Sequence, residues 1–400
     1  MKILMFGWEF PPLSNGGLGT ACYGLTKALS GMGVEITLVL PKAGDGAPDF
    51  VKIIPTNMSS VKITKVNSLL KGYMTSDEYD RQLKHFKEKG IAHMYGNDLF
   101  EEIERYSKKA AMIAKAEPHD VIYAHDWMTF KAAMAAKSVS HKPMIVQIHS
   151  TEFDRTGGHG ANSYVYDVER QGMKQADAVI AVSHFTKKKI LQHYDVPAEK
   201  IHVVHNAVEP TDIHFSCRKQ KKKVVLFLGR ITLQKGPEYF IHAAKKVLEH
   251  CPDTTFVMAG TGDMERRMIE LAAQMGISDK MLFAGFLKDE KVHEAYRMAD
   301  LYVMPSVSEP FGITALEAMM NHTPIVISKQ SGVSEIISHC LKVDFWDINR
   351  MADMMIGVLK HPELHETLEE NGTSEVSKVR WENSARRCLE VCSRIGVRHG

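Results

Sequence analysis

Two carboxylates eight residues apart follow an apolar run in the C-terminal half of the chain. Glu309 and Glu317 belong to the segment Ser308-Glu-Pro-Phe-Gly-Ile-Thr-Ala-Leu-Glu317. If the residues between them are mostly helical, the helical rise separates the two carboxylates by about 12 Å. An acid and a base that act on one glycosidic bond lie roughly 5–9.5 Å apart. The spacing therefore predicts two contacts along an extended ligand, and the alternative is that Glu317 is an ordinary solvated helix residue.

The same segment offers backbone donors where a helix is expected to begin. Phe311, Gly312 and Ile313 follow Pro310 directly. The first N–H groups of a helix have no acceptor within the helix, and a run of such free groups attracts anions. We expect these three residues to contact an anionic or polar part of a ligand.

Two cations follow another apolar run. Arg230 and Lys235 lie in Gly229-Arg-Ile-Thr-Leu-Gln-Lys-Gly-Pro237, after the expected strand 224–228. Pro237 suits the first turn of a helix, so the cations flank a strand end and a helix start. Ligands of open α/β sheets bind at this edge. The pattern predicts a clamp for a diphosphate, and the alternative is a pair of solvated surface cations.

A glycine-rich segment connects the first strand to a helix near the N-terminus. Gly16 and Gly17 precede a predicted helix, and a glycine turn there brings N–H groups and the positive end of the helix dipole to an anion. The dinucleotide fingerprint GxGxxG is not met, because Cys22 stands at the third glycine. Leu40-Pro-Lys42 ends the second strand without an acidic residue, which argues against a nicotinamide cofactor. Glycines that only shape a turn are the alternative.

Two histidines end neighbouring predicted strands. His125 and Asp126 follow the strand 121–124, and His149 follows the strand 144–148. We expect them on the same sheet edge as the glycine segment, in a direct role, although a histidine in such a place can also be purely structural. His202 and His205 are three residues apart along a strand and so face opposite sides, which argues against a metal site. The chain has no Asp-x-Asp pair, so we expect no metal and assign the phosphate countercharge to the cations.

The order of apolar runs and helical periods predicts an α/β fold with two parallel sheets. The strands expected in the first sheet are residues 2–6, 35–40, 121–124, 144–148, 179–182 and 202–204, and those in the second are 224–228, 255–259, 281–284, 301–304 and 324–327. The basic, aperiodic stretch 216–223 indicates a linker. Residues 44–117 are too long for one crossover, which indicates an insertion. Residues 381–395 have the apolar spacing of an amphipathic helix.

Composition excludes several classes of protein. Fifty Lys plus Arg against 48 Asp plus Glu leave a net charge of +2, which gives no support to nucleic-acid binding. Six cysteines without a CxxC pair suggest neither a disulfide framework nor a zinc site, and they fit the reducing cytoplasm. No apolar stretch reaches the length of about 18 residues that a membrane span requires, so we expect no integral membrane segment.

Taken together, these motifs resemble the retaining glycosyltransferases of the two-Rossmann-domain (GT-B) fold, specifically the glycogen and starch synthase-like branch. The resemblance covers essentially the whole chain. It rests on Glu309-x7-Glu317, Gly229-Arg230 with Lys235-Gly236, Gly16-Gly-Leu18, His125-Asp-Trp127 and Trp8-Glu-Phe-Pro11. In that branch a lysine usually stands two residues before the paired glycines and an acidic residue follows them, where this chain has Ser14 and Thr20.

The resemblance implies two Rossmann-like domains that face each other across a cleft. Residues 1–215 would form the acceptor-side domain, with residues 381–400 packing back on it, and residues 216–380 would bind the nucleotide sugar. It further implies a role for each candidate residue. Arg230, Lys235, Glu309 and His149 would be the catalytic residues, with the two cations on the donor diphosphate and Glu309 and His149 on the transferred sugar. Glu317 would bind the ribose, and the amides of Gly312 and Ile313 the sugar or phosphate. Gly16, Gly17 and Phe311 would also belong to the donor site, and Glu9, His125 and Asp126 to the acceptor side.

The implied activity is transfer of glucose from ADP- or UDP-glucose to an α-1,4-glucan, as in glycogen biosynthesis, without cofactor or metal. The expected partners are a nucleotide-diphosphate sugar and a glucan or oligosaccharide acceptor. Alternatives within the class are a sugar phosphate, sucrose-type or lipid-linked acceptor. Alternatives outside it are an NAD-dependent oxidoreductase and a non-catalytic glucan-binding relative. The sequence leaves the nucleotide base, the acceptor and the oligomeric state open.

Overall fold

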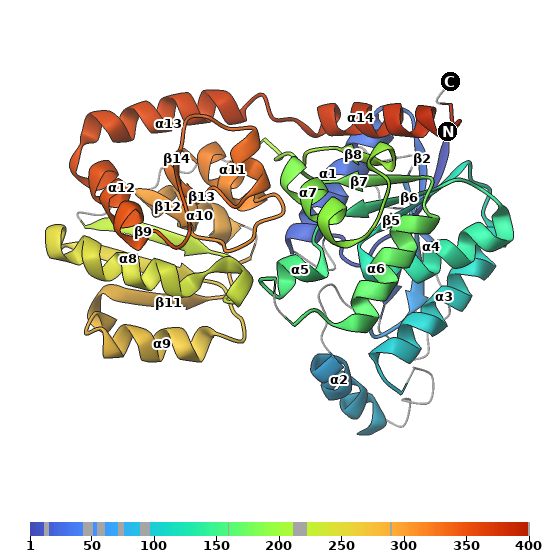
Figure 1. Ribbon diagram of the computed structural model, residues 1–400, viewed down its shortest axis with the longest axis horizontal. Coiled ribbons are helices and arrows are strands. Elements are labelled where there is room, and N and C mark those ends of the chain that lie inside the picture. The colour runs from blue at the N-terminus through green and yellow to red at the C-terminus, as the bar shows by residue number, and fades with distance from the viewer. Residues whose placement is uncertain are drawn as a thin grey trace.

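Parallel strands in two separate sheets organise the chain. The computed structural model describes residues 1–11, 16–42, 51–53, 61–70, 76–88, 97–158, 160–210, 222–288 and 290–398. One sheet has eight strands in the order β3-β4-β2-β1-β5-β6-β7-β8, and the other has six in the order β11-β10-β9-β12-β13-β14. We call the parts of the chain around these sheets the N-domain and the C-domain; they lie side by side in Figure 1.

The N-domain alternates strands with helices. Its strands are β1 (Lys2–Phe6), β2 (Glu35–Lys42), β3 (Val51–Ile53), β4 (Val61–Asn67), β5 (Val121–His125), β6 (Met144–Ile148), β7 (Ala178–Ala181) and β8 (Ile201–Val203). Its helices are α1 (Gly17–Gly31), α2 (Ser76–Glu88), α3 (Leu99–Ala116), α4 (Trp127–Ser140), α5 (Glu152–Arg155), α6 (Ser163–Gln175) and α7 (His184–His193).

The C-domain repeats this alternation on a smaller sheet. Its strands are β9 (Lys223–Leu228), β10 (Thr254–Ala259), β11 (Met281–Gly285), β12 (Leu301–Met304), β13 (Ile325–Ser328) and β14 (Leu341–Val343). Its helices are α8 (Pro237–His250), α9 (Glu265–Gln274), α10 (Glu290–Met298), α11 (Ile313–Met320), α12 (Ile348–Lys360) and α13 (Pro362–Val376), and α14 (Trp381–Arg394) follows. The 3-10 turns η3 (Leu233–Lys235) and η5 (Gly332–Glu335) lie in its loops.

Burial on both faces explains why the strands read as continuous apolar runs. In β1, Ile3 and Met5 pack into one apolar cluster, whereas Leu4 and Phe6 pack into another on the opposite face. All four side chains are buried. Alternate residues of a strand point to opposite faces, so one strand contributes to two cores.

The prediction of two domains with parallel sheets is confirmed, and three strands were missed. β3 pairs antiparallel with β4, and β4 pairs parallel with β2. β3 and β14 have three residues each, too few for a recognisable period. β4 was not recognised because the lysines in Val61-Lys-Ile-Thr-Lys65 interrupt its apolar run. The strand lies second from the edge of the sheet, inside β3. The predicted boundary at residues 215 and 216 lies outside the described residues, as does Ser14.

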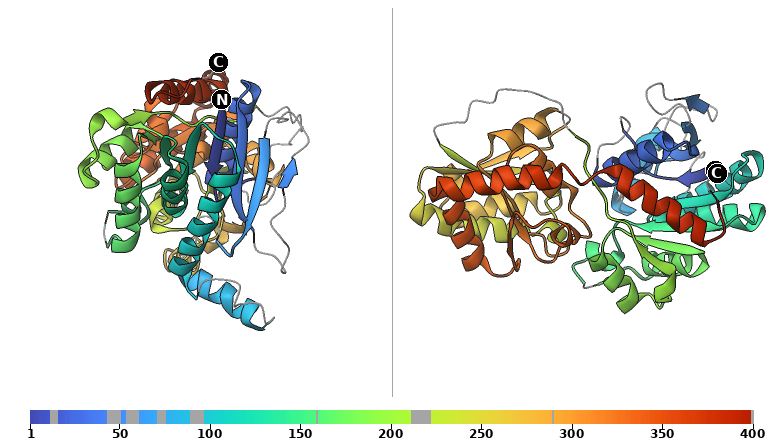
Figure 2. Two further views of the ribbon diagram at one scale, coloured as in Figure 1. Left: turned by 90° about the vertical axis from the view of Figure 1, so that its right-hand side faces the viewer. Right: turned by 90° about the horizontal axis from the view of Figure 1, so that it is seen from above.

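Helix α14 returns from the C-domain and packs against α1. Figure 2 shows the last two helices from above, with α13 along one domain and α14 across the other. The indole of Trp381, which is 3% exposed, lies over Gly24, where an added Cβ would come within 2.2 Å of the ring. Glycine at position 24 is therefore required by close approach of the ring. The Ser384 hydroxyl also donates to the carbonyl of His205 at 2.6 Å.

We predict that Trp381→Ala lowers the free energy of unfolding by about 3–5 kcal/mol, because it leaves a cavity between α14 and α1. The matched control is Trp346→Ala. That side chain is 57% exposed, so its loss should change the free energy by no more than about 0.5 kcal/mol. Urea titrations of both variants measure the difference. If both variants lost the same free energy of unfolding, the packing of Trp381 between α14 and α1 would contribute no more to stability than an exposed tryptophan does.

Candidate functional site

The predicted acidic residue Glu309 and the predicted cation Lys235 meet at the carboxyl edge of the C-domain sheet. Lys235 Nζ lies 2.5 Å from Glu309 Oε2, and the Ser306 hydroxyl donates to the same oxygen at 3.0 Å. The backbone N–H of Glu309 donates to the carbonyl of Gln330 at 2.9 Å. Glu309 is only 5% exposed. The loops after β9, β12 and β13 therefore fix one carboxylate between a cation and a hydroxyl.

The second predicted cation faces the N-domain. Arg230 is exposed, and its Nη2 donates to Gln234 Oε1 at 3.1 Å. Burial raises the pKa of Glu9, and the positive charge of Arg230 acts in the opposite direction. Because Glu9 belongs to the N-domain, this electrostatic interaction crosses between the domains.

Glu9 lies at the start of α1. Its Oε2 accepts the N–H of Gly19 at 3.2 Å, and an added Cβ at Gly16 would come within 2.3 Å of that oxygen. No atom of the described residues lies within 4 Å of an added Cβ at Gly17. The glycine at position 16 thus permits close approach of the protein's own carboxylate. Part of the anion-binding capacity expected for a ligand here is used by Glu9.

The loop after Glu309 turns sharply into α11. Gly312 has φ 108 and caps the helix, a backbone conformation that residues with a Cβ rarely adopt. Among the described residues, none accepts a hydrogen bond from the N–H groups of Gly312 and Ile313, and Phe311 is buried beside them. Farther along α11, burial raises the pKa of Glu317, and the Tyr296 hydroxyl donates to its carboxylate at 3.1 Å.

The two predicted histidines contact each other at the ends of β5 and β6. His125 Nδ1 lies 2.9 Å from His149 Nε2. Burial lowers the pKa of His125 to about 3, and burial together with the neighbouring ring holds the pKa of His149 well below its ordinary value. Both rings are therefore neutral near pH 7. The shared hydrogen bond fixes the orientation of His149.

Asp126 connects these two strand ends. Its Oδ1 accepts the N–H groups of His149 and Ser150 at 2.7 and 3.3 Å. The residue has φ 59, which is unusual for a residue with a side chain. Burial raises its pKa to about 7. Its Oδ2 and His125 Nε2 are buried without a hydrogen-bond partner in the part of the chain that the structure describes.

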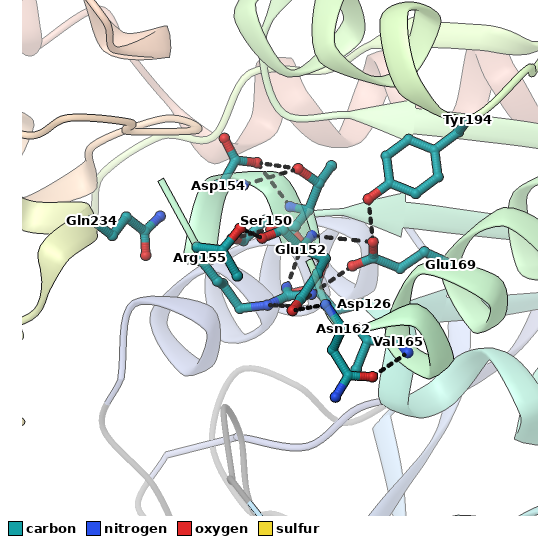
Figure 3. Close-up of polar contacts among 12 residues, drawn as sticks. Asp126, Ser150, Glu152, Asp154, Arg155, Asn162, Val165, Glu169, Tyr194 and Gln234 are labelled. Carbon is teal, nitrogen blue, oxygen red and sulfur yellow. Dashed lines mark hydrogen bonds and ion pairs between the residues drawn. The ribbon is translucent and has the colours of Figure 1, made fainter. Parts of the chain in front are cut away.

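A buried ionic cluster that the sequence did not predict lies next to Asp126 (Figure 3). Arg155 binds Glu152 at 3.0 Å and Glu169 at 2.6 Å, and it donates to the carbonyl of Ser150 at 2.8 Å. The Tyr194 hydroxyl donates to Glu169. These residues come from α5, α6 and the end of α7. Because they are far apart along the chain, no sequence spacing indicates that they are in contact. The one local signal was the capping box of α5 directly after β6.

Aromatic and polar groups line a small pocket beside this cluster. Its lining residues are Trp8, Leu18, Asp126, Trp127, Met128 and Arg155. Within the described ranges, Trp8 Nε1 is buried without an acceptor. The Trp8 ring stacks on Tyr106 with centroids 5.7 Å apart, which holds the indole in place. The pocket is thus lined by two indole rings, a carboxylate, a guanidinium and two apolar side chains.

The described residues offer neither a cluster of metal ligands nor a membrane span. No group of three or more His, Cys, Asp or Glu side chains among them could hold a metal ion. Every described helix is too short or too polar to traverse a bilayer.

Known proteins similar to this chain are glycosyltransferases. The family model "Glycosyl transferases group 1" matches residues 209–375, and "Glycosyltransferase Family 4" matches residues 15–212. An uncharacterized glycosyltransferase of Methanocaldococcus jannaschii is 30% identical over 98% of this chain and 97% of its own. Glycogen synthase of Mycobacterium tuberculosis is 28% identical over 84% of this chain and 80% of its own.

Solved structures share the fold. Sucrose-phosphate synthase from Thermosynechococcus elongatus superposes with a TM-score of 0.75 at 19% identity, covering 98% of both chains. Anabaena HepE in complex with UDP-glucose superposes with a TM-score of 0.69 at 17% identity, covering 98% of this chain and 100% of that one. At these identities the likeness concerns the arrangement of the two domains.

We predict a pH-dependent contribution of Asp126 to stability. Its pKa in the folded chain is about 7, above the ordinary value of 3.8, so the folded state retains a proton that the unfolded state releases. The contribution is fully present below about pH 4 and is lost as the pH rises through 7. Asp126→Asn removes this titration. Relative to wild type, the variant should gain on the order of 1–3 kcal/mol of unfolding free energy between pH 5 and pH 8.

Urea titrations at the two pH values give this difference. Comparing two pH values cancels any constant cost of the amide, which keeps the Oδ1 acceptor. Asp279→Asn is the matched control, because Asp279 is exposed. Its unfolding free energy should change between the two pH values by as much as that of wild type. If the unfolding free energy of Asp126→Asn changed with pH as that of wild type does, burial of the Asp126 carboxylate would carry no free-energy cost in the folded chain.

Proposed function

Because the chain belongs to the glycosyltransferases, we propose that it transfers glucose from ADP- or UDP-glucose to the end of an α-1,4-glucan, with retention of the anomeric configuration. In this proposal the C-domain binds the donor and the N-domain presents the acceptor. The observation that carries the proposal is the contact of Lys235 with Glu309 at 2.5 Å, next to the N–H groups of Gly312 and Ile313, for which the described residues supply no acceptor.

This contact suits a donor that has a diphosphate and a sugar side by side. A diphosphate has the negative charge to draw Lys235 away from Glu309, with Arg230 as a second cation. The carboxylate of Glu309 is then available to accept hydrogen bonds from sugar hydroxyls. The N–H groups at the start of α11 add oriented donors, and Glu317 would accept from the ribose. Cations placed before the reaction stabilise the charge that develops on the leaving phosphate.

The transfer step needs no side-chain nucleophile in this proposal. The bond between the anomeric carbon and the phosphate oxygen breaks, and the electron pair goes to the leaving nucleoside diphosphate. The acceptor hydroxyl forms the new bond on the same face and gives its proton to the leaving phosphate. We propose that no metal takes part, with Arg230 and Lys235 supplying the countercharge.

On the N-domain side, we assign His149 to the transferred sugar. Its Nε2 is engaged by His125 at 2.9 Å, which leaves Nδ1 for a sugar hydroxyl. A depressed pKa keeps the ring neutral, so that it adds no positive charge beside an anomeric carbon that itself becomes electron-deficient. His125 then acts by orienting His149.

The pocket on the acceptor side supports an uncharged acceptor. Its one cation among the described lining residues, Arg155, is bound by Glu152 and Glu169 and by the carbonyl of Ser150. Asp126 Oδ2 and Trp8 Nε1 offer one acceptor and one donor, a combination that fits sugar hydroxyls. A phosphate placed among these lining residues would meet a carboxylate and a cation that is already neutralised. We therefore favour a glucan end over a sugar phosphate.

We predict that the protein lengthens maltooligosaccharides by single glucose units in α linkage, with excess EDTA present throughout. The test is incubation with a panel of nucleotide sugars and acceptors, followed by mass spectrometry and linkage analysis of the products. Fructose 6-phosphate, inositol phosphate and lipid-linked saccharides are the comparison acceptors. Products from one of these alone would refute the glucan acceptor, and activity only after manganese or magnesium is restored would refute the metal-free donor site.

We predict that Lys235→Ala and Arg230→Ala each lower kcat/KM by about a hundredfold or more, equivalent to about 3 kcal/mol of transition-state stabilisation. Arg266→Ala is the matched control, because the Arg266 side chain is 92% exposed on α9 of the same domain. Thermal unfolding checks that each variant is folded. Turnover within threefold of wild type in both variants would show that the diphosphate clamp is misassigned.

A further inference from the structure

A serine of the C-domain inserts between two charged residues of the N-domain. The Ser308 hydroxyl donates to Asp154 Oδ1 at 2.6 Å and lies 2.8 Å from Lys189 Nζ. Asp154 and Lys189 form an ion pair of 2.8 Å with each other. Asp154 is fully buried and Ser308 is 2% exposed. The Ser308 hydroxyl is thus bound between two charged side chains of the N-domain. Glu309 is the next residue along the chain.

Both charged residues are held by the N-domain itself. Asp154 Oδ2 accepts the N–H and the hydroxyl of Thr151 at 2.8 and 2.7 Å in the capping box of α5. Lys189 projects from α7. Burial raises the pKa of Asp154, but the positive charge of Lys189 and the hydrogen bonds from Lys189, Ser308 and Thr151 outweigh it and lower that pKa. The ion pair and the capping box themselves lie entirely within the N-domain.

The same face of α7 holds the next residues of the loop. Ser183 and Thr186 donate to the carbonyl of Pro310 at 2.6 and 3.3 Å. Together with Lys189 they are spaced by three residues, which places them along one helix face. An added Cβ at Gly332 would come within 2.5 Å of Ser183, so the two surfaces are in close contact. Hydrogen bonds to the N-domain therefore hold the residues on both sides of Glu309, Ser308 and Pro310.

We infer that Asp154 and Lys189 are a preassembled receptor for the Ser308 hydroxyl, and that these two positioning residues set Glu309 against the N-domain half of the site. The inference rests on the proposed function in one respect, the binding of the transferred sugar by Glu309. It is independent of which acceptor is used.

The arrangement of charges makes this contact reversible. When the domains separate, Asp154 and Lys189 remain paired with each other, so no buried charge loses its partner. The Ser308 hydroxyl and the Pro310 carbonyl exchange their protein partners for water, and Glu335 loses His205. A contact in which the ion pair itself crossed the interface would be far harder to break. The geometry suits a site that must open to load a donor and close to react.

The experiment compares Ser308→Ala and Lys189→Met with wild type in steady-state kinetics and in small-angle X-ray scattering with and without UDP or ADP. Asp154 is left intact because its capping box holds α5. Lys189→Arg is the conservative variant that restores a cation. Lys174→Met is the matched control, because Lys174 pairs with the exposed Asp195 at 2.6 Å on the surface of the same domain. Circular dichroism and thermal unfolding verify folding.

We expect Ser308→Ala and Lys189→Met to lower kcat about tenfold or more, as for loss of a hydrogen bond to a charged group, with little change in nucleotide affinity. Lys189→Arg should recover most of the turnover, and Lys174→Met should match wild type. In scattering, the two defective variants with nucleotide should be more extended than wild type with nucleotide. Purely structural damage would instead lower the melting temperature and weaken nucleotide binding together.

Unchanged kcat in Ser308→Ala, or scattering curves that coincide with wild type, would overturn the inference. A wild type without transfer to any acceptor would refute the proposed function alone. The scattering comparison still decides on the receptor in that case, because it requires only nucleotide binding and domain closure.

Discussion

Burial of carboxylates between two facing domains is the constraint on which the site depends. A buried carboxylate without a partner is very costly, and the structure pairs three such groups with one cation each: Glu309 with Lys235, Asp154 with Lys189, and Glu169 with Arg155. Each pair lies within one domain. These three pairs therefore stay intact when the domains separate, whereas Glu335 of the C-domain loses His205 and the N–H groups of His184 and Phe185. The Ser308 loop itself contributes a hydroxyl and a carbonyl to the contacts between the domains.

Asp126 has no such ion pair, and neither has Glu9 among the described residues. Asp126 Oδ1 is held by backbone N–H groups, and burial raises the pKa of Asp126 to about 7 although the nearby charge of Arg155 acts in the opposite direction. The φ of 59 is a strained conformation of the kind that concentrates at functional sites. The turn it makes brings the ends of β5 and β6 together and aligns His125 with His149.

Periodicity and strand ends are the features of the sequence that predicted the fold and much of the site. Parallel strands bring their carboxyl ends to one edge, which placed His125 near His149 and the Arg230 loop near Glu309. Arg155, Glu169 and Tyr194 escaped prediction because they come together from separate helices, and Ser308 because its partners belong to the other domain. The glycine segment was predicted as a ligand loop, but at Gly16 the space is needed for Glu9. Composition alone does not distinguish a glycine that admits a ligand from one that admits a side chain.

The electrostatic difference between the two halves of the site bears on where a proton can go during the proposed transfer. The C-domain side has Arg230 and a Lys235 that is paired with Glu309, whereas the described residues of the N-domain side offer two neutral histidines, Asp126 with a pKa of about 7, and a cation bound by two carboxylates. Histidines with depressed pKa values are weak bases near pH 7. The leaving phosphate gains negative charge as its bond to the sugar breaks, so its basicity rises at the moment when the acceptor hydroxyl must lose its proton. Because the histidines are weak bases, and because retention brings the hydroxyl to the face of the sugar that the phosphate leaves, we propose the phosphate and not a histidine as the acceptor of that proton.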